Sequence, residues 1–572
     1  MSPFVRRWEL GPTDGRLALA VLALLLAVYT ASFTGLPEVS DGEIEFQTTS
    51  ALARGGGLAI GGTPEAERIL EEARRLESSP GAFPVARGVT GADSEGERWY
   101  AWFGPGQALV GLPFYGLGRL LSALYPDIEA RHAATTRYGA PRSEYFPHLL
   151  VGWRNPLLTA LTGALLFLCA RHLGTSRRSA FAAALLWGLT TFAWPQARST
   201  LSDVQASFLL FLAFHGILRL RALLVSLSPV GWGPPLQTGL ALGAAVLTRV
   251  ASIPAAGALC VIALWVLHSC RRGSSSPAPA GTRWAFPRLA LGLSPFVVCF
   301  MLLNQLRHGS PFETGYGPAL DGFFGFSIPR ALAGLFLSPG RGLLFLAPTT
   351  LLLLPALTRL RRDGDRLCLG SLFIMTPAVL APVVTSAAWH GAWSFGPRYL
   401  LPLLPFIALG MALGIERLRQ GAFGRRLVVL LALVGLLVQL GGVLVDHATH
   451  HDLATRAARL HWETPPDTPE ADADLARFER IQWDPGFAAP AAHWRILRHR
   501  LSLGSDDFPT EQIFGIQEAQ RLTPIHERDR GWNHLAWVDF STRLGGSPWP
   551  PLALVLALAL GGLGLAAGKL DG

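Results

Sequence analysis

Long apolar runs, separated by short arginine-rich segments, follow one another along nearly the whole chain. A helix needs roughly 17 to 25 mostly apolar residues to cross about 30 Å of hydrocarbon, and most of the runs approach that length. The pattern therefore predicts an all-α polytopic membrane protein, a helical bundle with about twelve transmembrane helices. The runs cover residues 17–33, 149–170, 180–195, 204–218, 236–251, 253–268, 289–306, 343–357, 367–387, 399–415, 427–445 and 551–568.

The arginine clusters between the runs predict which loops face the cytoplasm. Loops that stay inside carry the excess of Arg and Lys, because moving these cations across the membrane is unfavourable. Arg6, Arg7 and Arg16 place the N-terminus inside, and later clusters such as 171–178 and 417–426 fall on the same side if each run crosses once. We therefore expect a multi-pass protein of the bacterial inner membrane with both termini in the cytoplasm. The first run is longer than a signal-peptide core and no small-residue cleavage site follows it, which favours a retained span over a signal peptide.

Two long polar stretches lie on the outer face in this topology. The first covers residues 36–148, and the apolar part within it, 103–124, is a poor straight helix because of its Gly and Pro residues, so we expect a juxtamembrane or re-entrant segment. The second is a polar segment of α or α+β type. The predicted organisation is a transmembrane catalytic module over 1–445, an outer polar domain over 446–548, and a last transmembrane helix with a cytoplasmic tail over 549–572.

Composition agrees with a membrane protein and argues against several other classes. Half of the 572 residues are apolar and 16% are charged, and the mean hydropathy is +0.34. The net charge of +9 does not indicate a nucleic-acid partner, because the arginines lie in short clusters between apolar runs. The five cysteines lie in or beside apolar runs with no C-x-x-C spacing, which favours core residues over disulfides or metal ligands. A group of metal-ligand residue types, Asp446, His447, His450, His451 and Asp452, matches no established spacing, so no metal site is predicted there.

The first outer loop opens with a group of carboxylates just beyond the first span. If this stretch is helical, Asp41 and Glu45 share a face while Glu43 points elsewhere. A carboxylate at the membrane surface suits a general base that deprotonates an acceptor held beside a lipid-linked donor. The same residues also fit an ordinary solvated acidic loop, since carboxylates are common on exposed surfaces.

This Asp-Gly-Glu sequence, followed by a helical segment over 46–54, resembles the first outer loop of the GT-C glycosyltransferases, a superfamily that includes protein O-mannosyltransferases and lipid A aminoarabinose transferases. The resemblance implies that Asp41 is essential for catalysis, as the base or as an acceptor-orienting or metal-binding group, and that Glu43 is a second catalytic carboxylate. All of the further matching segments fall on the outer face in the topology predicted from the arginines. These segments are 100–115, 304–317, 338–342 and 389–400.

The resemblance also implies a set of substrate-binding residues. Asp203 stands where the superfamily often has a pair of acidic residues; with one Asp here, a divalent cation is an option and not a requirement. Arg398 and Arg341 are candidates for the carrier phosphate, because a guanidinium can form two parallel hydrogen bonds to an anionic oxygen, although each also fits an interfacial topology role. Arg249, near the outer end of a span, is a weaker candidate.

Aromatic and polar residues of the matching segments complete the expected substrate site. Trp102 can stack on a sugar ring, or it can be a belt aromatic at the headgroup level. The other expected substrate-binding residues are Glu313, Tyr316, His390 and Tyr399.

The predicted function is an integral-membrane glycosyltransferase that moves a sugar, with inversion, from a polyprenyl-phosphate carrier to an acceptor on the periplasmic side. The acceptor is a lipid, a glycan or a protein, the bilayer is the other partner, and no nucleotide cofactor is required. Two alternatives stay open: a transporter or flippase of lipid-linked glycans, and a non-catalytic membrane assembly subunit. Transporters usually carry inverted repeats and charges near the midplane, whereas the distinctive polar residues here gather on one face.

Overall fold

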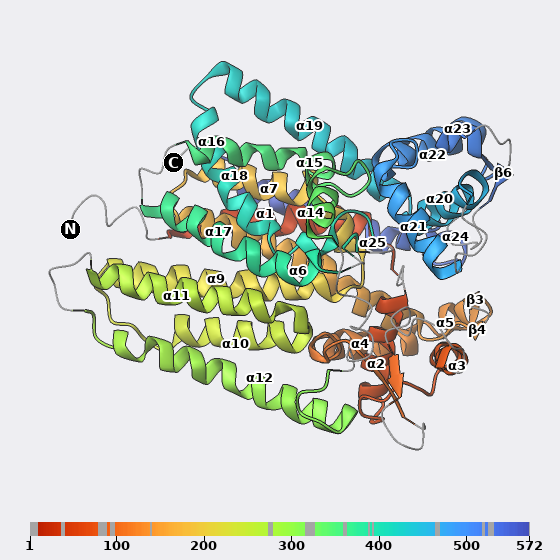
Figure 1. Cartoon of the computed structure of the whole chain (residues 1–572), viewed down its shortest axis with the longest axis horizontal. Helices are drawn as coiled ribbons and strands as arrows, with labels where there is room; N and C mark the ends of the chain where they lie inside the picture. The colour runs from red at the N-terminus through yellow and green to blue at the C-terminus, as the bar shows by residue number, and fades with distance from the viewer. Residues whose placement is uncertain are drawn as a thin grey trace.

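The structure is a computed structural model that describes residues 10–35, 40–77, 89–91, 98–137, 140–272, 278–314, 327–358, 363–386, 389–391, 394–463, 470–516, 521–523 and 531–570. Helices make up almost all of it, and they pack as a bundle with additional helices at one end (Figure 1). The chain is thus an all-α polytopic membrane protein, as the apolar runs predict.

The helices of the first half include the carboxylate-bearing segment and the spans around it. They are α1 (Pro12–Ala31), α2 (Ser40–Ala53), α3 (Pro64–Glu77), α4 (Gly106–Leu124), α5 (Pro126–Ala133), α6 (Tyr145–His172), α7 (Arg177–Thr190), α8 (Ala193–Arg198), α9 (Ser202–Val225), α10 (Gly233–Thr248), α11 (Ile253–Arg272) and α12 (Ala285–His308), with 3₁₀ turns η3 (Val250–Ser252) and η4 (Thr282–Trp284).

The helices of the second half end in the outer polar segment and a last apolar helix. They are α14 (Ile328–Leu337), α15 (Leu343–Leu346), η5 (Pro348–Leu353), α16 (Leu354–Leu357), α17 (Asp363–Val384), η6 (Arg398–Leu400), α18 (Leu404–Leu418), α19 (Ala422–Leu444), α20 (His447–His461), α21 (Glu470–Trp483), α22 (Ala489–Leu503), α23 (Thr510–Phe514), α24 (Ala536–Thr542) and α25 (Trp549–Ala566). The strands form three antiparallel pairs: β1 (Val89–Gly91) with β2 (Trp99–Ala101), β3 (Thr136–Arg137) with β4 (Ala140–Pro141), and β5 (Phe508–Pro509) with β6 (Arg521–Leu522).

Within the described residues, eight helices are long and apolar enough to cross a membrane, and a ninth is reached if α4 and α5, which meet at 99°, count as one broken span. Four of the twelve predicted spans correspond to shorter or broken helices: α7, α10, α18, and the run 343–357, which Pro348 and Pro355 divide into α15, η5 and α16. The number of about twelve spans and the juxtamembrane placement of α4 therefore stay predictions.

The predicted basic clusters meet at one end of the bundle. Asp14, in the first turn of α1, accepts from Arg171 Nε at 2.9 Å and from Arg177 Nε at 3.1 Å. At the same end, Arg417 Nη2 lies 3.2 Å from an oxygen of Asp365. The segments expected outside, α2 to α5 and α20 to α24, lie together at the opposite end (Figure 1). This arrangement agrees with loops sorted by charge to two sides of a membrane.

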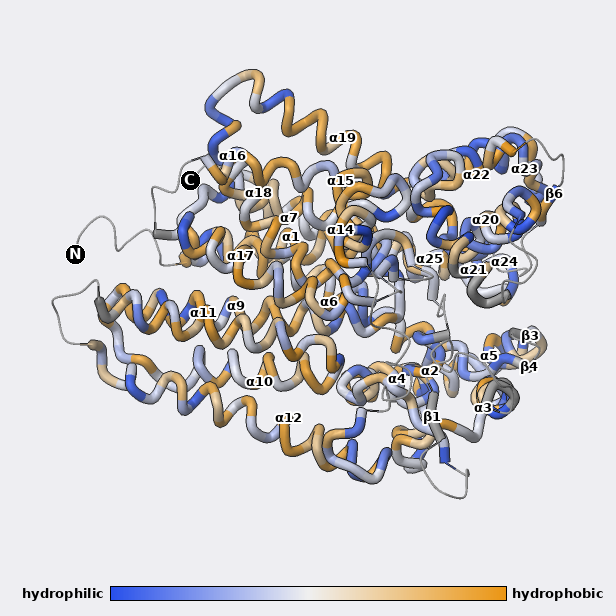
Figure 2. The backbone as a smooth tube through the Cα atoms, viewed as in Figure 1, coloured by the Kyte–Doolittle hydropathy of each residue, from blue (hydrophilic) through white to orange (hydrophobic). Residues whose placement is uncertain are grey.

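The bundle buries large aromatic side chains inside and exposes apolar ones outside. Tyr29, Trp187 and Phe406 are among its fully buried residues. In contrast, Leu430 and Leu433 on α19 are more than half exposed, and hydrophobic colour runs along the helices of the bundle while hydrophilic colour gathers at the end that carries α20 to α24 (Figure 2). Exposed apolar side chains along a helix are expected where lipid is the solvent.

The outer polar segment has its own small core. Side chains of α20, α22 and α23 pack around Phe487 and Trp462, separately from the core of the bundle. This outer domain follows α19 directly, so its position is fixed close to the outer ends of the spans.

Candidate functional site

A carboxylate and a guanidinium that are far apart in sequence meet at the end of the bundle opposite the basic clusters. Asp41 lies in the first turn of α2, and Arg398 begins η6. Arg398 Nη2 is 3.5 Å from Asp41 Oδ2, and the exposed fractions of the two side chains are 10% and 29%. Asp41 is therefore paired and still reachable from outside.

A second ion pair lies beside the first. Asp203, in the first turn of α9, is almost fully buried, and Arg249 Nη1, just beyond α10, is 2.8 Å from its Oδ2. The two atoms are close, but this oxygen has no hydrogen bond of good geometry among the described residues, so the pair is held mainly by charge. Arg249 and Arg398 both contact the ring of Tyr399, at 5.2 and 5.1 Å from its centroid. Five sequence-predicted residues thus form one cluster.

Glu45 lies one helical turn after Asp41 and is buried. Burial raises the pKa of Glu45 to about 8; Arg154 opposes this, while the negative charges of Asp41 and Asp203 add to it. The carboxyl lines a small pocket together with Gln107, His148, Arg154 and Thr200. The helical spacing placed Glu45 on the face of Asp41, but its burial next to two other carboxylates could not be read from the sequence.

Glu43 lies on another face of α2, as the helical spacing predicts. Its Oε1 accepts from Gln47 Nε2 at 2.7 Å and lies 3.0 Å from His148 Nε2 on α6. These contacts are buried. They connect α2 to α6, and they bring together residues 105 positions apart in the chain.

The Gly104-Pro105-Gly106 sequence fits against the end of α10. A Cβ on Gly104 would lie 2.1 Å from the carbonyl oxygen of Leu247, and one on Gly106 would lie 2.7 Å from the nitrogen of Thr248. Gln205 Nε2 donates to the Gly106 carbonyl at 3.0 Å and to Thr248 Oγ1 at 2.8 Å. Only glycine permits this approach, which fixes the start of α4 beside Arg249.

Trp102 precedes this contact and is buried, so its indole is not presented to solvent. Arg307 at the end of α12 donates to the carbonyls of the residues on either side of it, Ala101 at 3.1 Å and Phe103 at 3.0 Å. These bonds hold the loop on which Trp102 lies, and whether its ring meets a sugar stays a prediction.

Arg341 is buried and engaged by main-chain and side-chain acceptors. Its Nε donates to Gln482 Oε1 at 3.0 Å, and its Nη1 donates to the carbonyls of Ser394 and Gly396, the latter at 2.9 Å. Burial, together with the charge of Arg398, lowers the pKa of Arg341 to about 9. In this structure Arg341 braces the segment that precedes Arg398 and joins it to α21.

Three of the predicted residues remain: His390, Glu313 and Tyr316. His390 is buried between Trp389 and Phe478, with ring centroids 5.5 and 4.4 Å away. Burial, with the charges of Arg341 and Arg398, holds the pKa of His390 well below its usual value, so the imidazole is neutral. Glu313 follows α12 and accepts from the Thr314 nitrogen at 3.0 Å. Tyr316 lies outside the described residues.

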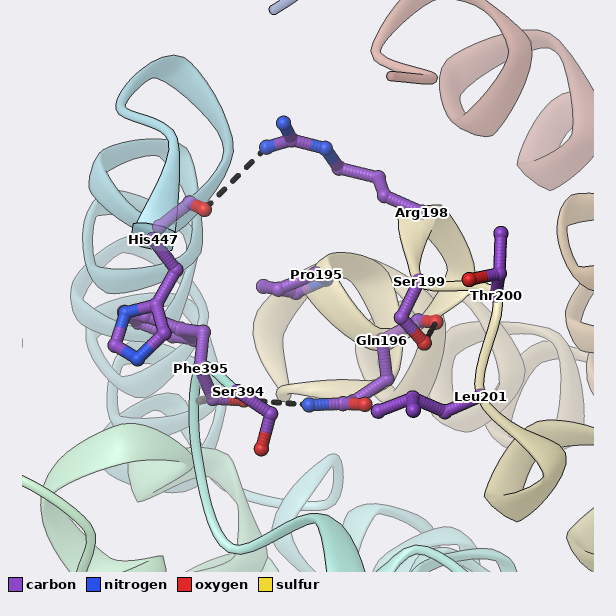
Figure 3. A pocket seen from close by; sticks show the side chains of 10 residues that line it. Pro195, Gln196, Arg198, Ser199, Thr200, Leu201, Ser394, Phe395 and His447 are labelled. Carbon is purple, nitrogen blue, oxygen red and sulfur yellow. Dashed lines mark hydrogen bonds between the residues drawn. The ribbon is translucent and has the colours of Figure 1, made fainter. Parts of the chain in front are cut away.

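A second pocket lies where the bundle meets the start of the outer domain (Figure 3). His447 and Phe395 lie on one side of it and the segment from Pro195 to Leu201 on the other. Gln196 Nε2 donates to the Phe395 carbonyl at 2.8 Å across the pocket. Arg198 also faces it and donates from Nη1 to the carbonyls of Gly442 and Val443.

Comparison with known proteins gives a partial sequence match. Residues 110–298, about a third of the chain, match the family described as dolichyl-phosphate-mannose-protein mannosyltransferase. The matched segment contains Asp203 and Arg249 but neither Asp41 nor Arg398. No curated protein matches the sequence.

Several solved structures align with the chain at low sequence identity. ArnT from Cupriavidus metallidurans bound to undecaprenyl phosphate aligns at 12% identity over 96% of this chain and 77% of that chain, with a TM-score of 0.44. The S. cerevisiae protein O-mannosyltransferase Pmt1-Pmt2 complex bound to the sugar donor aligns at 14% identity over 58% and 38%, with a TM-score of 0.34. The Archaeoglobus fulgidus oligosaccharyltransferase in the apo form aligns at 12% identity over 83% and 60%, with a TM-score of 0.36.

Proposed function

We propose that the chain is a membrane glycosyltransferase of the GT-C type, which transfers a sugar from a polyprenyl-phosphate carrier to an acceptor on the outer face of the inner membrane; the match of residues 110–298 to a mannosyltransferase family supports this class. The observation that carries this proposal is the contact between Asp41 and Arg398. In this contact a partly exposed carboxylate lies beside a guanidinium, at the end of the bundle that the arginine pattern assigns to the outer face. A base and an anion-binding group are the two elements that displacement of a phosphate requires.

The reaction is a single displacement with inversion. The acceptor oxygen attacks the anomeric carbon from the face opposite the phosphate, the bond between that carbon and the phosphate oxygen breaks, and Asp41 takes the acceptor proton. The electron pair of the broken bond leaves with the polyprenyl phosphate. Because the phosphate is its own leaving group, the reaction needs no nucleotide cofactor.

Arg398 binds the phosphate oxygens and stabilises the charge that develops on them. Charge-assisted hydrogen bonds from a guanidinium to phosphate are short and directional. Tyr399, which contacts both Arg398 and Arg249, holds the two guanidiniums on the same side of the site. The loose 3.5 Å pair with Asp41 leaves Arg398 able to exchange this carboxylate for a phosphate when the donor binds.

The other carboxylates position this centre. Asp203 holds Arg249, so that a second positive charge stays beside the phosphate site. Glu43 ties α2 to α6 through His148 and fixes the helix that carries Asp41. Glu45 stays protonated near neutral pH and therefore does not repel Asp41 or Asp203.

The first test measures release of undecaprenyl phosphate by purified protein in nanodiscs that contain a panel of undecaprenyl-phosphate-linked sugars and a membrane extract as the source of acceptor. We expect Asp41→Asn to reduce release by about 10²- to 10⁴-fold, the usual contribution of a general base. Asp127→Asn, an exposed carboxylate of α5 in the same outer loop, is the matched control and should be unaffected.

Two results would reject the proposal. One is a wild-type rate for Asp41→Asn. The other is movement of the lipid-linked sugar across proteoliposomes without release of undecaprenyl phosphate, which would identify a transporter. The acceptor itself can be identified from the glycolipids and glycans that change in a deletion strain, analysed by mass spectrometry.

A further inference from the structure

Three histidines of the outer domain come together away from the Asp41 centre. His447 and His450 lie one turn apart on α20, and His493 comes from α22. All three are buried, and one ring nitrogen from each lies within 4.8 Å of the others. The sequence could not indicate this group, because His493 is far from the other two in the chain.

Among the described residues, the hydrogen bonds of these rings leave four of their six nitrogens without a protein partner. His450 Nε2 bonds to the carbonyl of Phe487, and His493 Nδ1 bonds to the carbonyl of Gly441, both at 3.0 Å. A carbonyl only accepts, so these two nitrogens carry the hydrogen and the lone pairs lie on His450 Nδ1 and His493 Nε2. Across the described residues those two nitrogens, and both nitrogens of His447, have no hydrogen-bond partner.

This pattern is the one that metal-binding histidines show. A histidine that binds a metal through one nitrogen almost always donates the other N–H to a carbonyl or carboxylate, which fixes the tautomer and the orientation of the ring. His450 and His493 both do so with main-chain carbonyls. Buried lone pairs without partners are otherwise rare, because each loses its contact with water and gains nothing in return.

The surroundings of the rings leave a place for a further ligand. His447 and Arg198 both line the pocket in Figure 3. The positive charge of Arg198 favours an anion or hydroxide over a neutral molecule as that ligand. A histidine binds a cation in its neutral form, so metal binding is expected to weaken at acidic pH.

We propose that His447, His450 and His493 bind a transition-metal dication, best matched by Zn²⁺. Three imidazole nitrogens and one non-protein ligand make a tetrahedral site with Zn–N distances of about 2.0 to 2.1 Å, which sets the nitrogens about 3.4 Å apart. One nitrogen of each ring already lies within 4.8 Å of the other two without a metal, so small ring rotations complete the geometry.

Such a metal joins the outer domain to the wall of the proposed catalytic centre. The ring of Phe395, three residues before Arg398, lies 5.9 Å from that of His447 and 5.3 Å from that of His493. His493 also bonds to the end of α19. The site therefore fixes α20, α22 and the segment 394–398 relative to one another, whether or not the chain transfers sugars.

The test measures metal content in the full-length protein, purified in detergent with an affinity tag free of histidine and then equilibrated with Zn²⁺ and desalted. Mass spectrometry of the metals should find one Zn²⁺ per chain in the wild type and in the control His461→Ala, an exposed histidine of α20. His450→Gln, which keeps a donor for the Phe487 carbonyl, should weaken Zn²⁺ binding by more than the roughly 10- to 100-fold that losing a supporting partner costs.

A second measurement needs no variant. The X-ray absorption spectrum of the zinc-loaded wild type should show a four-coordinate ion with three imidazole nitrogens. A wild type that retains no zinc, a His450→Gln protein that retains as much as the wild type, or a spectrum of a water-coordinated ion would each overturn the proposal.

Discussion

Removing Arg249 should destabilise the protein because it leaves the buried carboxylate of Asp203 without its partner. Two unit charges 2.8 Å apart attract by about 6 kcal/mol at an effective dielectric constant of about 20. Breaking a buried pair by deleting one member costs about 3 to 5 kcal/mol. A quarter of the Arg249 side chain is exposed, so water screens part of this attraction and we expect about 2 to 4 kcal/mol for Arg249→Met.

The partner substitutions separate this cause from a simple loss of packing. Asp203→Asn leaves Arg249 partly hydrated, so it should cost no more than about 1 kcal/mol, and in the double variant the substitution of Arg249 should add little. The coupling energy of the cycle is then close to the cost of Arg249→Met alone.

The assay is thermal unfolding in one detergent, with the four proteins compared at equal concentration. Arg249→Met should lower the apparent Tm by several degrees, and adding Asp203→Asn should restore most of that loss. A wild-type Tm for Arg249→Met, or a double variant less stable than either single one, would refute the pairing.

Three further predictions follow from other contacts. Gly104→Ala places a methyl group against the carbonyl oxygen of Leu247 and should lower both the apparent Tm and the rate of sugar transfer. Gly116→Ala on α4, where the added Cβ meets open space, is the control and should be neutral or slightly stabilising. Equal effects of the two substitutions would refute the contact. The free energy of unfolding of the wild type should fall as pH rises from about 5 to 8, because folded Glu45, with its pKa raised to about 8, keeps a proton that the unfolded chain releases. The contribution of this one group falls by about 1.4 kcal/mol per pH unit. Thermal scans from pH 5 to 9 should show that Glu45→Gln removes this contribution. Glu43→Gln should lower the apparent Tm while Asp41→Asn should not, since a partly exposed pair contributes only about 0 to 1 kcal/mol; the opposite order would show that Glu43 does not hold α2.

Most of the central cluster was predictable from the sequence because its members lie at the ends of spans that the arginine clusters assign to the outer face. Asp41 follows the first span, Asp203 and Arg249 flank two others, and Arg398 with Tyr399 precedes a fourth. Once the arginines assign the loops to sides, residues at span ends on one side must share a surface. The distances among them, and the contact of Tyr399 with both arginines, depend on packing angles that no local pattern encodes.

The parts that could not be predicted depend on long-range contacts. The pairing of Glu43 with His148, the acceptors around Arg341, and the meeting of His493 with α20 each join segments far apart in the chain. The lengths of the helices could not be predicted from the hydropathy pattern either. A run such as 343–357 is apolar throughout, yet its prolines end one helix and begin another, and only the folded chain shows where.

Because the connection between β2 and α4 fits closely against α10, its number of residues is critical. The number of residues in the loop after α2 is not. The backbone of Gly104 and Gly106 must meet Leu247 and Thr248 in one register. Deleting a single residue between Trp99 and Gly106 would therefore shift every later contact of α4. A residue inserted after α2, where Gly55 and Gly57 have open space around them, lies outside that register, so the loop can change length there without disturbing Asp41 or Arg249.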